Sequence, residues 1–380
     1  MSNIIVLGSG MVGSAMAIDL AKQHQVTVTD IDQDALGRAQ EKCPELRTRQ
    51  LDITDVNELQ SMLANHDLAI NALPGHLGFK TLITIIEAGR PVIDITFFPE
   101  NALELDPLAK KNNVTAIVDC GIAPGMSNLI LGHYNEILKL TDFECLVGGL
   151  PKIKKWPFYY KAPFSPGDVI EEYTRPVRYV EKGKIVVKEP LSDCEYINFG
   201  HVGKLESFNS DGLRSLLFTM PHIPNMKEKT LRYPGHIEYI KVLKETGFFN
   251  TDEINMDGCM IAPLDFTSRI LFNEWKLGEE EEEMTLMQVT MKGINVKGQS
   301  EEVVYTLYDE YNTATRTSSM ARTTGYTATA AANLLLEGLF REKGVFPPEL
   351  VGQHKVCFDF ILKYLEDRKI HYVKSSRVIA

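Results

Sequence analysis

The sequence lacks the features that mark membrane or exported proteins. No run of about 18 apolar residues occurs, which is the length needed to cross a bilayer, so we expect no contact with a membrane. The N-terminus leads directly into an apolar stretch at Ile4–Leu7, with no basic segment or cleavage site before it. This start predicts a cytoplasmic protein without a secretory signal.

Cysteine is sparse, and basic residues are outnumbered by acidic ones. The six cysteines are scattered with no Cys-x-x-Cys pair, which predicts reduced thiols and no metal site. Lys and Arg number 40 against 51 Asp and Glu, a net charge of −11. Because nucleic-acid affinity depends on basic side chains, we expect no nucleic-acid partner.

The first third of the chain alternates short apolar runs with amphipathic stretches. This alternation predicts an α/β fold: a Rossmann-type, doubly wound parallel sheet with helices on both faces. The predicted strands are Ile4–Leu7, Val26–Thr29, Leu46–Leu51, Leu68–Ala72, Val92–Ile95 and Val114–Val118. The predicted helices are Val12–Gln23, Ile31–Glu41, Asp55–Asn65, Phe79–Ala88 and Asn101–Asn112.

The pattern changes after Gly125. Paired β-rich segments flank Lys182-Gly183 and Lys297-Gly298, which predicts antiparallel hairpins. Helices are predicted at Met126–Leu138, Ile237–Glu245, Leu264–Lys276, Ala328–Phe340 and Phe358–Arg368. The middle of the chain is therefore expected to form an α+β domain with an open, mainly antiparallel sheet.

A glycine-rich turn follows the first predicted strand. The run Gly8-Ser9-Gly10-Met11-Val12-Gly13 matches the G-x-G-x-x-G pattern of dinucleotide-binding proteins. The first glycine permits the tight turn, the second lets the backbone approach the pyrophosphate, and the third lets the helix pack on the strand. These six residues are predicted to bind the cofactor at a helix N-terminus.

An acidic residue ends the second predicted strand. Asp30 lies 22 residues after Gly8, near the spacing at which a carboxylate binds the adenosine ribose. It would repel a 2′-phosphate, as would Asp32, and no Arg or Lys stands at positions 30–34. The sequence therefore predicts NAD rather than NADP.

Ligands of an open parallel sheet bind beyond the carboxyl ends of its strands. We expect the loops after the first, fourth, fifth and sixth strands to face the nicotinamide, and the loop after the third to approach the adenine. The further residues predicted to bind the cofactor are Ile31, Asp52, Ile53, Asn71, Ala72, Leu73, Pro74, Ile95 and Thr96.

Four residues of these loops are candidates for chemistry. His76 would titrate near neutral pH, as an acid–base group must, although a surface histidine also fits this position. Asp94 and Asp119 end apolar strands, where each could hold an ammonium or water, or cap the next helix. Cys120 follows Asp119 and is a candidate substrate contact; no histidine adjoins it, so we do not expect a thiolate nucleophile.

Several longer runs add a family resemblance. Besides the glycine turn and Asn71–Pro74, they are Asp119-Cys120-Gly121-Ile122-Ala123-Pro124-Gly125-Met126, Val147-Gly148-Gly149-Leu150-Pro151, Phe164-Ser165-Pro166 with Glu171-Glu172-Tyr173, Thr230-Leu231-Arg232-Tyr233-Pro234-Gly235-His236 and Gly344-Val345-Phe346-Pro347-Pro348-Glu349. With these runs the sequence resembles the saccharopine dehydrogenase-like family over nearly its whole length. Within that family it looks most similar to the lysine 6-dehydrogenase type.

The resemblance implies a nucleotide-binding domain interrupted by a substrate-binding and dimerisation domain. We therefore expect domains at residues 1–125, 126–322 and 323–380, the last being helices that return to the first domain, and a homodimer. Saccharopine reductases proper usually prefer NADP and have longer chains, so Asp30 and the shorter length point away from them. The substrate stays open, because the resemblance extends to enzymes that act on lysine, saccharopine and carboxylated polyamines.

The resemblance also implies a reaction. We expect NAD-dependent oxidation of a CH–NH or CH–NH2 group of an amino acid, lysine or a saccharopine-like derivative, through an imine. One alternative is reductive condensation of an amine with an aldehyde, as in saccharopine or carboxynorspermidine formation. Another is a non-catalytic NAD-binding regulator.

An amino-acid substrate needs a cation for its carboxylate. Arg232 and Arg214 are candidates because guanidinium binds carboxylates bidentately, although either could be a surface or interface arginine. Glu171 and Glu172 could receive an ammonium or be solvated, and His236 could lie near the site or cap the following helix.

Overall fold

A parallel sheet forms the N-terminal domain. The computed structural model describes residues 1–164, 166–278 and 280–379, so Ser165 of the Phe164-Ser165-Pro166 run lies outside it. In these ranges seven parallel strands follow the order β17-β6-β5-β4-β1-β2-β3. The strands are β1 (Asn3–Leu7), β2 (Gln25–Asp30), β3 (Arg47–Gln50), β4 (Leu68–Asn71), β5 (Val92–Asp94), β6 (Thr115–Ile117) and β17 (Gly344–Phe346). The predicted Rossmann-type fold is confirmed.

Helices cover both faces of this sheet because alternate strand residues point to opposite sides. Ile4 and Val6 pack with α1, α2 and α11, whereas Ile5 and Leu7 pack with α3, α4 and α5. The helices are α1 (Met11–Ala21), α2 (Gln33–Lys42), α3 (Val56–Leu63), α4 (Gly75–Glu87), α5 (Asp106–Lys111), preceded by the 3₁₀ turn η1 (Ala102–Leu105), and α11 (Ser319–Leu336). Each fully buried aliphatic side chain contributes roughly 1.5–3 kcal/mol to this packing.

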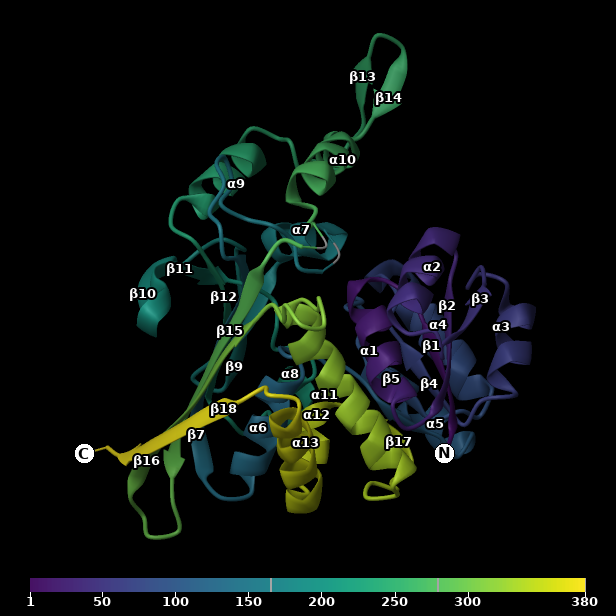
Figure 1. The fold of residues 1–380 in the computed structure, drawn as a ribbon. Coiled ribbons are helices and arrows are strands. Elements are labelled where there is room, and N and C mark those ends of the chain that lie inside the picture. Colours follow the sequence, from purple (N-terminus) through teal and green to yellow (C-terminus); the bar gives the residue numbers. More distant parts are fainter. Residues whose placement is uncertain (165, 279, 380) are drawn as a thin grey trace.

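A second sheet forms the other domain (Figure 1). In the described chain it follows the order β10-β11-β12-β7-β15-β16-β18, and the β8–β9 hairpin pairs with β12. Only the β12–β7 pair of this path is parallel in the described residues, which confirms the expected mainly antiparallel sheet. The strands are β7 (Lys139–Pro151), β8 (Val177–Glu181), β9 (Lys184–Lys188), β10 (Glu195–Phe199), β11 (Gly203–Asn209), β12 (Asn225–Arg232), β15 (Glu283–Ile294), β16 (Ser300–Glu310) and β18 (Tyr372–Val378).

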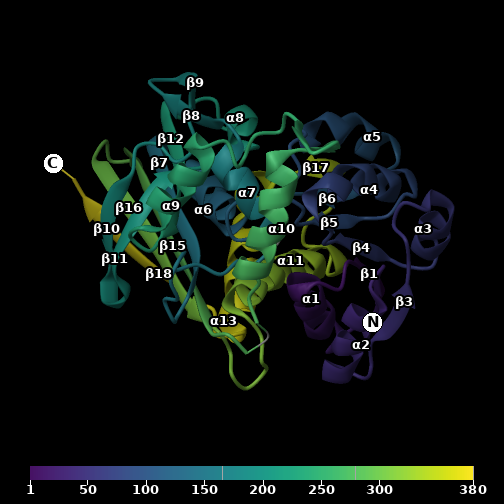
Figure 2. The ribbon, with the colours of Figure 1, turned by 90° about the horizontal axis from the view of Figure 1, so that it is seen from above.

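The remaining elements include α7 and α10, which lie between the two sheets in the view from above (Figure 2). In chain order these elements are α6 (Met126–Asn135), α7 (Pro166–Thr174), η2 (Gly200–Val202), α8 (Leu216–Thr219), α9 (His236–Glu245), the hairpin β13 (Ile254–Met256) and β14 (Cys259–Ile261), α10 (Pro263–Trp275), α12 (Pro348–Gly352) and α13 (Lys355–Asp367). Trp275 is fully buried in a separate aromatic core that α7, α9 and α10 share. No helix of the described ranges has the length and apolarity to span a membrane.

Several elements differ from the sequence-based expectation. Helix α4 begins at Gly75, so His76 lies in a helical first turn rather than in a loop. Helix α11 begins at Ser319 rather than at Ala328. Its first turns are buried and show no polar stripe, so the sequence does not mark them as part of the helix. The sequence predicts neither β17 nor β18 as a strand, because β17 has only three residues and β18 is largely exposed.

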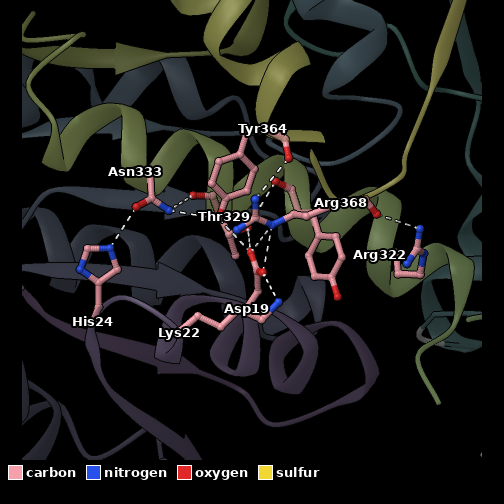
Figure 3. A network of polar contacts seen from close by, with 9 residues as sticks. Asp19, Lys22, His24, Arg322, Thr329, Asn333, Tyr364 and Arg368 are labelled. Atoms are coloured by element: carbon pink, nitrogen blue, oxygen red, sulfur yellow. Dashed lines mark hydrogen bonds and ion pairs between the residues drawn. The ribbon is translucent and has the colours of Figure 1, made fainter. Parts of the chain in front are cut away.

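A buried ion pair ties α1 to the C-terminal helices (Figure 3). Asp19 of α1 accepts hydrogen bonds from Arg368 Nε at 2.9 and 2.8 Å, and from the hydroxyls of Tyr364 and Thr329 at 2.8 Å each. Arg322 of α11 donates to the Arg368 carbonyl at 3.2 Å, and it also pairs with an acid of β16. The helix that follows the glycine turn is thereby linked to the second sheet.

Candidate active site

A cavity of about 810 Å³ lies between the carboxyl ends of the parallel strands and the second domain. This volume falls within the usual range of ligand sites. Loops of the first domain line one end, which we call the nucleotide end. Strands β7 and β12, helix α7 and the loop after β11 line the other, the substrate end.

The glycine turn forms one wall of the nucleotide end. Gly8 has φ +103°, and a Cβ there would lie 2.6 Å from the Ala72 carbonyl oxygen. A Cβ at Gly13 would lie 2.0 Å from the Gly8 oxygen, whereas one at Gly10 would have no described atom within 4 Å beyond its own chain neighbours. Gly10 caps α1 without a side-chain hydrogen bond, so its first-turn N–H groups are available to an anion.

Asp30 is held at the end of β2 by the turn that it faces. Its carboxylate accepts from the Ser9 N–H at 2.7 Å and from the Asp32 N–H at 2.9 Å. The basic side chains that line the cavity within the described residues are Arg175 and Arg232, both at the substrate end.

Most residues predicted to bind the cofactor line this end together. They are Gly8, Gly10, Met11, Val12, Gly13, Asp30, Ile31, Asp52, Ile53, Ala72, Leu73, Pro74, Ile95 and Thr96. Ser9 and Asn71 do not line the cavity. Asn71 instead donates from Nδ2 to the Gly78 carbonyl at 3.0 Å and to Asp94 Oδ2 at 2.6 Å, and so joins the loops after β4 and β5.

Three of the four residues singled out for chemistry in these loops lie outside the cavity. Asp94 is fully buried and accepts from the Thr96 N–H at 2.8 Å and its hydroxyl at 2.6 Å, while burial raises its pKa to about 7. Cys120 is buried, and burial raises its pKa. His76 is exposed on the first turn of α4.

Asp119 lines the cavity and is paired with Arg214. Arg214 Nε donates to Asp119 at 2.8 Å, and its Nη1 donates to the Phe98 carbonyl at 2.7 Å. The ring of Phe97 lies 4.7 Å from the Arg214 guanidinium and 5.0 Å from that of Arg175. Arg214, predicted as a carboxylate ligand, thus directs its donors to the protein and does not line the cavity.

Arg232 ends β12 and does line the cavity. Its Nη2 donates to Glu172 at 2.7 Å and to the Tyr160 hydroxyl at 3.3 Å, and its Nε donates to the Tyr173 hydroxyl at 3.3 Å. The side chain is 2% exposed, so the aromatic core around Trp275 fixes its position. Glu171 and Glu172 both line the substrate end.

His236 lies behind this arginine rather than in the cavity lining. Its Nε2 bonds the Tyr173 hydroxyl at 2.9 Å and its Nδ1 bonds the Phe158 carbonyl at 2.8 Å. Burial, with Arg232 adding to it, lowers the pKa of His236 to about 3. It is the first residue of α9, whose N-cap is Gly235, so it neither lines the cavity nor caps the helix.

Sequence reasoning misses Glu228, which lines the substrate end. Glu228, Thr230 and Arg232 are alternate residues of β12, and all three line the cavity. Alternate residues of a strand share a face, so counting back from Arg232 in steps of two residues would have identified Glu228. Within the described residues, no group of three or more His, Cys, Asp or Glu side chains is arranged to hold a metal.

Two family models match the chain. The saccharopine dehydrogenase NADP binding domain matches residues 4–117, and the saccharopine dehydrogenase C-terminal domain matches residues 121–370. Together they extend from β1 into the segment before β18.

Individual proteins agree with the models. Carboxyaminopropylagmatine dehydrogenase of Synechocystis sp. is 24% identical over 381 residues, 92% of each chain. The NADP(+), L-glutamate-forming saccharopine dehydrogenase of Saccharomyces cerevisiae is 27% identical over 66% of this chain and 59% of its own length.

The fold agrees as well. The apo structure of the L-Glu-forming saccharopine dehydrogenase from Saccharomyces cerevisiae superposes with a TM-score of 0.80 at 22% identity, over 100% of both chains. With a pyridine-nucleotide-binding domain at its N-terminus, the chain belongs to the saccharopine dehydrogenase family, whose members are oxidoreductases of amino-acid substrates.

Proposed function

We propose that the protein is an NAD-dependent dehydrogenase that acts on the CH–NH or CH–NH2 group of an amino acid, lysine or a saccharopine-like derivative. One observation supports this most: a single cavity joins the dinucleotide turn to the ion pair of buried Arg232 with partly exposed Glu172. Bound nicotinamide would supply hydride transfer at a carbon that bears nitrogen, by way of an imine.

The residues of the nucleotide end fit a dinucleotide. The open space over Gly10 and the uncapped N-terminus of α1 suit the pyrophosphate, Asp30 suits the ribose hydroxyls, and Asp52 with Ile53 would face the adenine. NAD is favoured over NADP because Asp30 repels a 2′-phosphate and no described basic side chain lines this end. Arg38 lies outside the lining, 3.8 Å from Asp32.

Arg232 is the residue that we propose for the substrate carboxylate. It is a fixed, desolvated guanidinium at the substrate end, and such a group binds a carboxylate in two parallel hydrogen bonds. Glu172 forms an ion pair with Arg232, and Glu171 or Glu172 would accept a substrate ammonium. Asp119 is the predicted catalytic residue that the cavity exposes; roles for His76, Asp94, Cys120 and Arg214 stay predictions.

A second reaction has its own support. The relatives named carboxyaminopropylagmatine dehydrogenase and saccharopine dehydrogenase favour the reductive joining of an amine to an aldehyde or its reverse. Both reactions use the same imine and the same cavity, so the observed geometry fits either.

The experiment that tests these proposals measures NADH at 340 nm. The wild-type protein is mixed with NAD and lysine, with NAD and saccharopine, or with NADH and an aldehyde–amine pair, and each is repeated with the phosphorylated cofactor. NADH formed from lysine alone supports the first reaction, and NADH consumed only by the pair replaces it with the second. Cofactor binding without turnover of any amine would instead support a non-catalytic NAD-binding regulator.

We also propose that the protein is a cytoplasmic homodimer, as expected for the family. Light scattering after size-exclusion chromatography measures the mass directly. A mass of one chain, 42.7 kDa, at micromolar concentration would contradict the dimer.

A further inference from the structure

Glu228 is a buried carboxyl group of the substrate end without a hydrogen-bond or ion-pair partner among the described residues. It is 5% exposed and lines the cavity, and its carboxylate makes no hydrogen bond or ion pair among the described residues. Every other acid discussed at this end is paired: Asp119 with Arg214, Glu172 with Arg232, and Glu171 with Arg175. A buried carboxyl group without a partner is costly, so it calls for a ligand or a chemical role.

The backbone of the fold holds this carboxyl group in place. Glu228 lies within β12, whose register with β7 places it opposite Cys145. A Cβ at Gly212 would lie 1.6 Å from Glu228 Oε1, so this glycine leaves just enough room for the carboxyl group. The group therefore points to one place in the cavity, on the same strand face as Arg232.

We propose that Glu228 exchanges the proton of the substrate nitrogen. The inference rests on the proposed function, because it needs an amine substrate at the substrate end. If Arg232 binds the substrate carboxylate, Glu228 reaches a group farther along the same molecule, which is where the reacting nitrogen of an amino acid such as lysine would lie.

The step balances in both directions. In oxidation the Glu228 carboxylate forms an O–H bond with a proton of the substrate ammonium, and the N–H electron pair stays on nitrogen. That lone pair then forms the C=N bond while the C–H electron pair leaves with its hydrogen to the oxidised nicotinamide. In reduction the iminium accepts hydride from the reduced nicotinamide, and the protonated Glu228 then gives its proton to the amine nitrogen that results.

The charges around Glu228 suit this role. The groups that face it are Glu172 of α7, Asp211 and Arg214 after β11, Asp119 after β6, Tyr179 of β8 and Cys145 of β7. Burial, with Glu172 and Asp211 adding to it, raises the pKa of Glu228 to about 8, although Arg214 opposes the shift. An acid–base group is most effective when its pKa lies near the working pH.

The test compares three variants of the full-length protein. Glu228→Gln keeps the shape and removes the exchangeable charge, so we expect kcat to fall by about 10²- to 10⁴-fold while NAD affinity is unchanged. Gly212→Ala keeps the charge and displaces the carboxyl group, so it should also lower kcat. Glu349→Gln is the control, because Glu349 is also a buried glutamate but lies outside the cavity lining.

A second readout does not depend on turnover. Binding of L-lysine or saccharopine to the NAD-loaded protein is measured by calorimetry in two buffers of different ionisation enthalpy between pH 6.5 and 9. Because a bound ammonium favours the Glu228 carboxylate, the wild type should release a proton below about pH 8. Glu228→Gln should bind without this release.

The outcomes separate the two proposals. Turnover with an unchanged kcat and pH profile in Glu228→Gln overturns the role of Glu228 and leaves the proposed function standing. Proton-linked binding without turnover in the wild type supports Glu228 as a proton-exchanging group and overturns the dehydrogenase. A protein that neither binds nor turns over these amines overturns both.

Discussion

Arg214 and Asp119 form a buried ion pair that joins the two domains across the edge of the cavity. Arg214 Nε lies 2.8 Å from Asp119 Oδ1, and the side chains of Arg214 and Asp119 are 6% and 5% exposed. Removing one partner leaves the other charged and desolvated. We therefore expect Asp119→Asn or Arg214→Met to lower the free energy of unfolding by about 3–5 kcal/mol, measured by urea denaturation.

The double variant is the control for this prediction. Because Asp119→Asn with Arg214→Met buries no unpaired charge, it should recover much of the lost stability. If turnover then recovers as well, Asp119 acts by holding the loops together. Additive losses of stability would show that the two residues are not coupled.

Cofactor choice should depend on Asp30. Replacing it with Ser removes the ribose acceptor and the repulsion of a 2′-phosphate, so we expect affinity for NAD to fall by about 10- to 100-fold and the preference over NADP to shrink. Fluorescence titration with both reduced cofactors measures the ratio. A wild type that already prefers NADPH would contradict the proposal of NAD.

The ion pair of Asp19 should make the free energy of unfolding depend on pH in the acidic range. Burial opposes the charge of Asp19, but Arg368, Lys22 and Tyr364 together outweigh it, and the pKa of Asp19 lies below its usual value. The stabilisation is therefore present above the unfolded pKa near 3.8 and is lost as pH falls through the lower folded pKa. Asp19→Asn should be less stable at pH 7 by about 3–5 kcal/mol, and the difference should shrink on acidification.

Lys22 provides the comparison for Asp19. It also pairs with Asp19, but its side chain is 61% exposed. Lys22→Ala should change the free energy of unfolding by less than about 1 kcal/mol. An effect as large as that of Arg368→Met would mean that the exposed pair holds α1 in place.

The contribution of Glu228 to stability should depend on pH in the opposite sense to that of Asp19. Its folded pKa of about 8 is higher than the usual value of 4.5, so folding favours the protonated form. Stability is greatest below the unfolded pKa and is lost as pH rises toward the folded one. Thermal unfolding from pH 5 to 9 should show Glu228→Gln gaining on the wild type, by about 1.4 kcal/mol for each unit of pKa difference. A constant difference across this range would place the titration elsewhere.

The nucleotide end could be predicted from the sequence because its residues act locally. Gly8, Gly13 and Asp30 meet through two neighbouring strands and one helix, and each follows a spacing rule. The substrate end follows no such rule. Arg232 meets Glu172 and Tyr160 across 60 and 72 residues of chain, and helices of a separate core hold them together.

The structure differs from the sequence-based expectation at four positions. Asp94 and Arg214 have chemistry suited to a ligand, yet neighbouring loops use that chemistry for internal hydrogen bonds. His76 was placed in a loop because the start of α4 at Gly75 has no capping side chain in the sequence. Glu228 was missed because strand β12 bears charged residues on both faces, so its inward positions have no apolar signature.

Because β17 lies late in the chain, the sheet of the nucleotide-binding domain is completed only late in synthesis. This sheet's edge partner to β6 comes from residues 344–346, more than 220 residues after Ile117 in the chain. A ribosome adds about 5–20 residues each second, so the sheet emerges without that edge for many seconds. The unpaired edge of β6 is then open to other strands. Nascent chains arrested before Gly344 should therefore be the species that most need a chaperone, although their glycine turn is already complete.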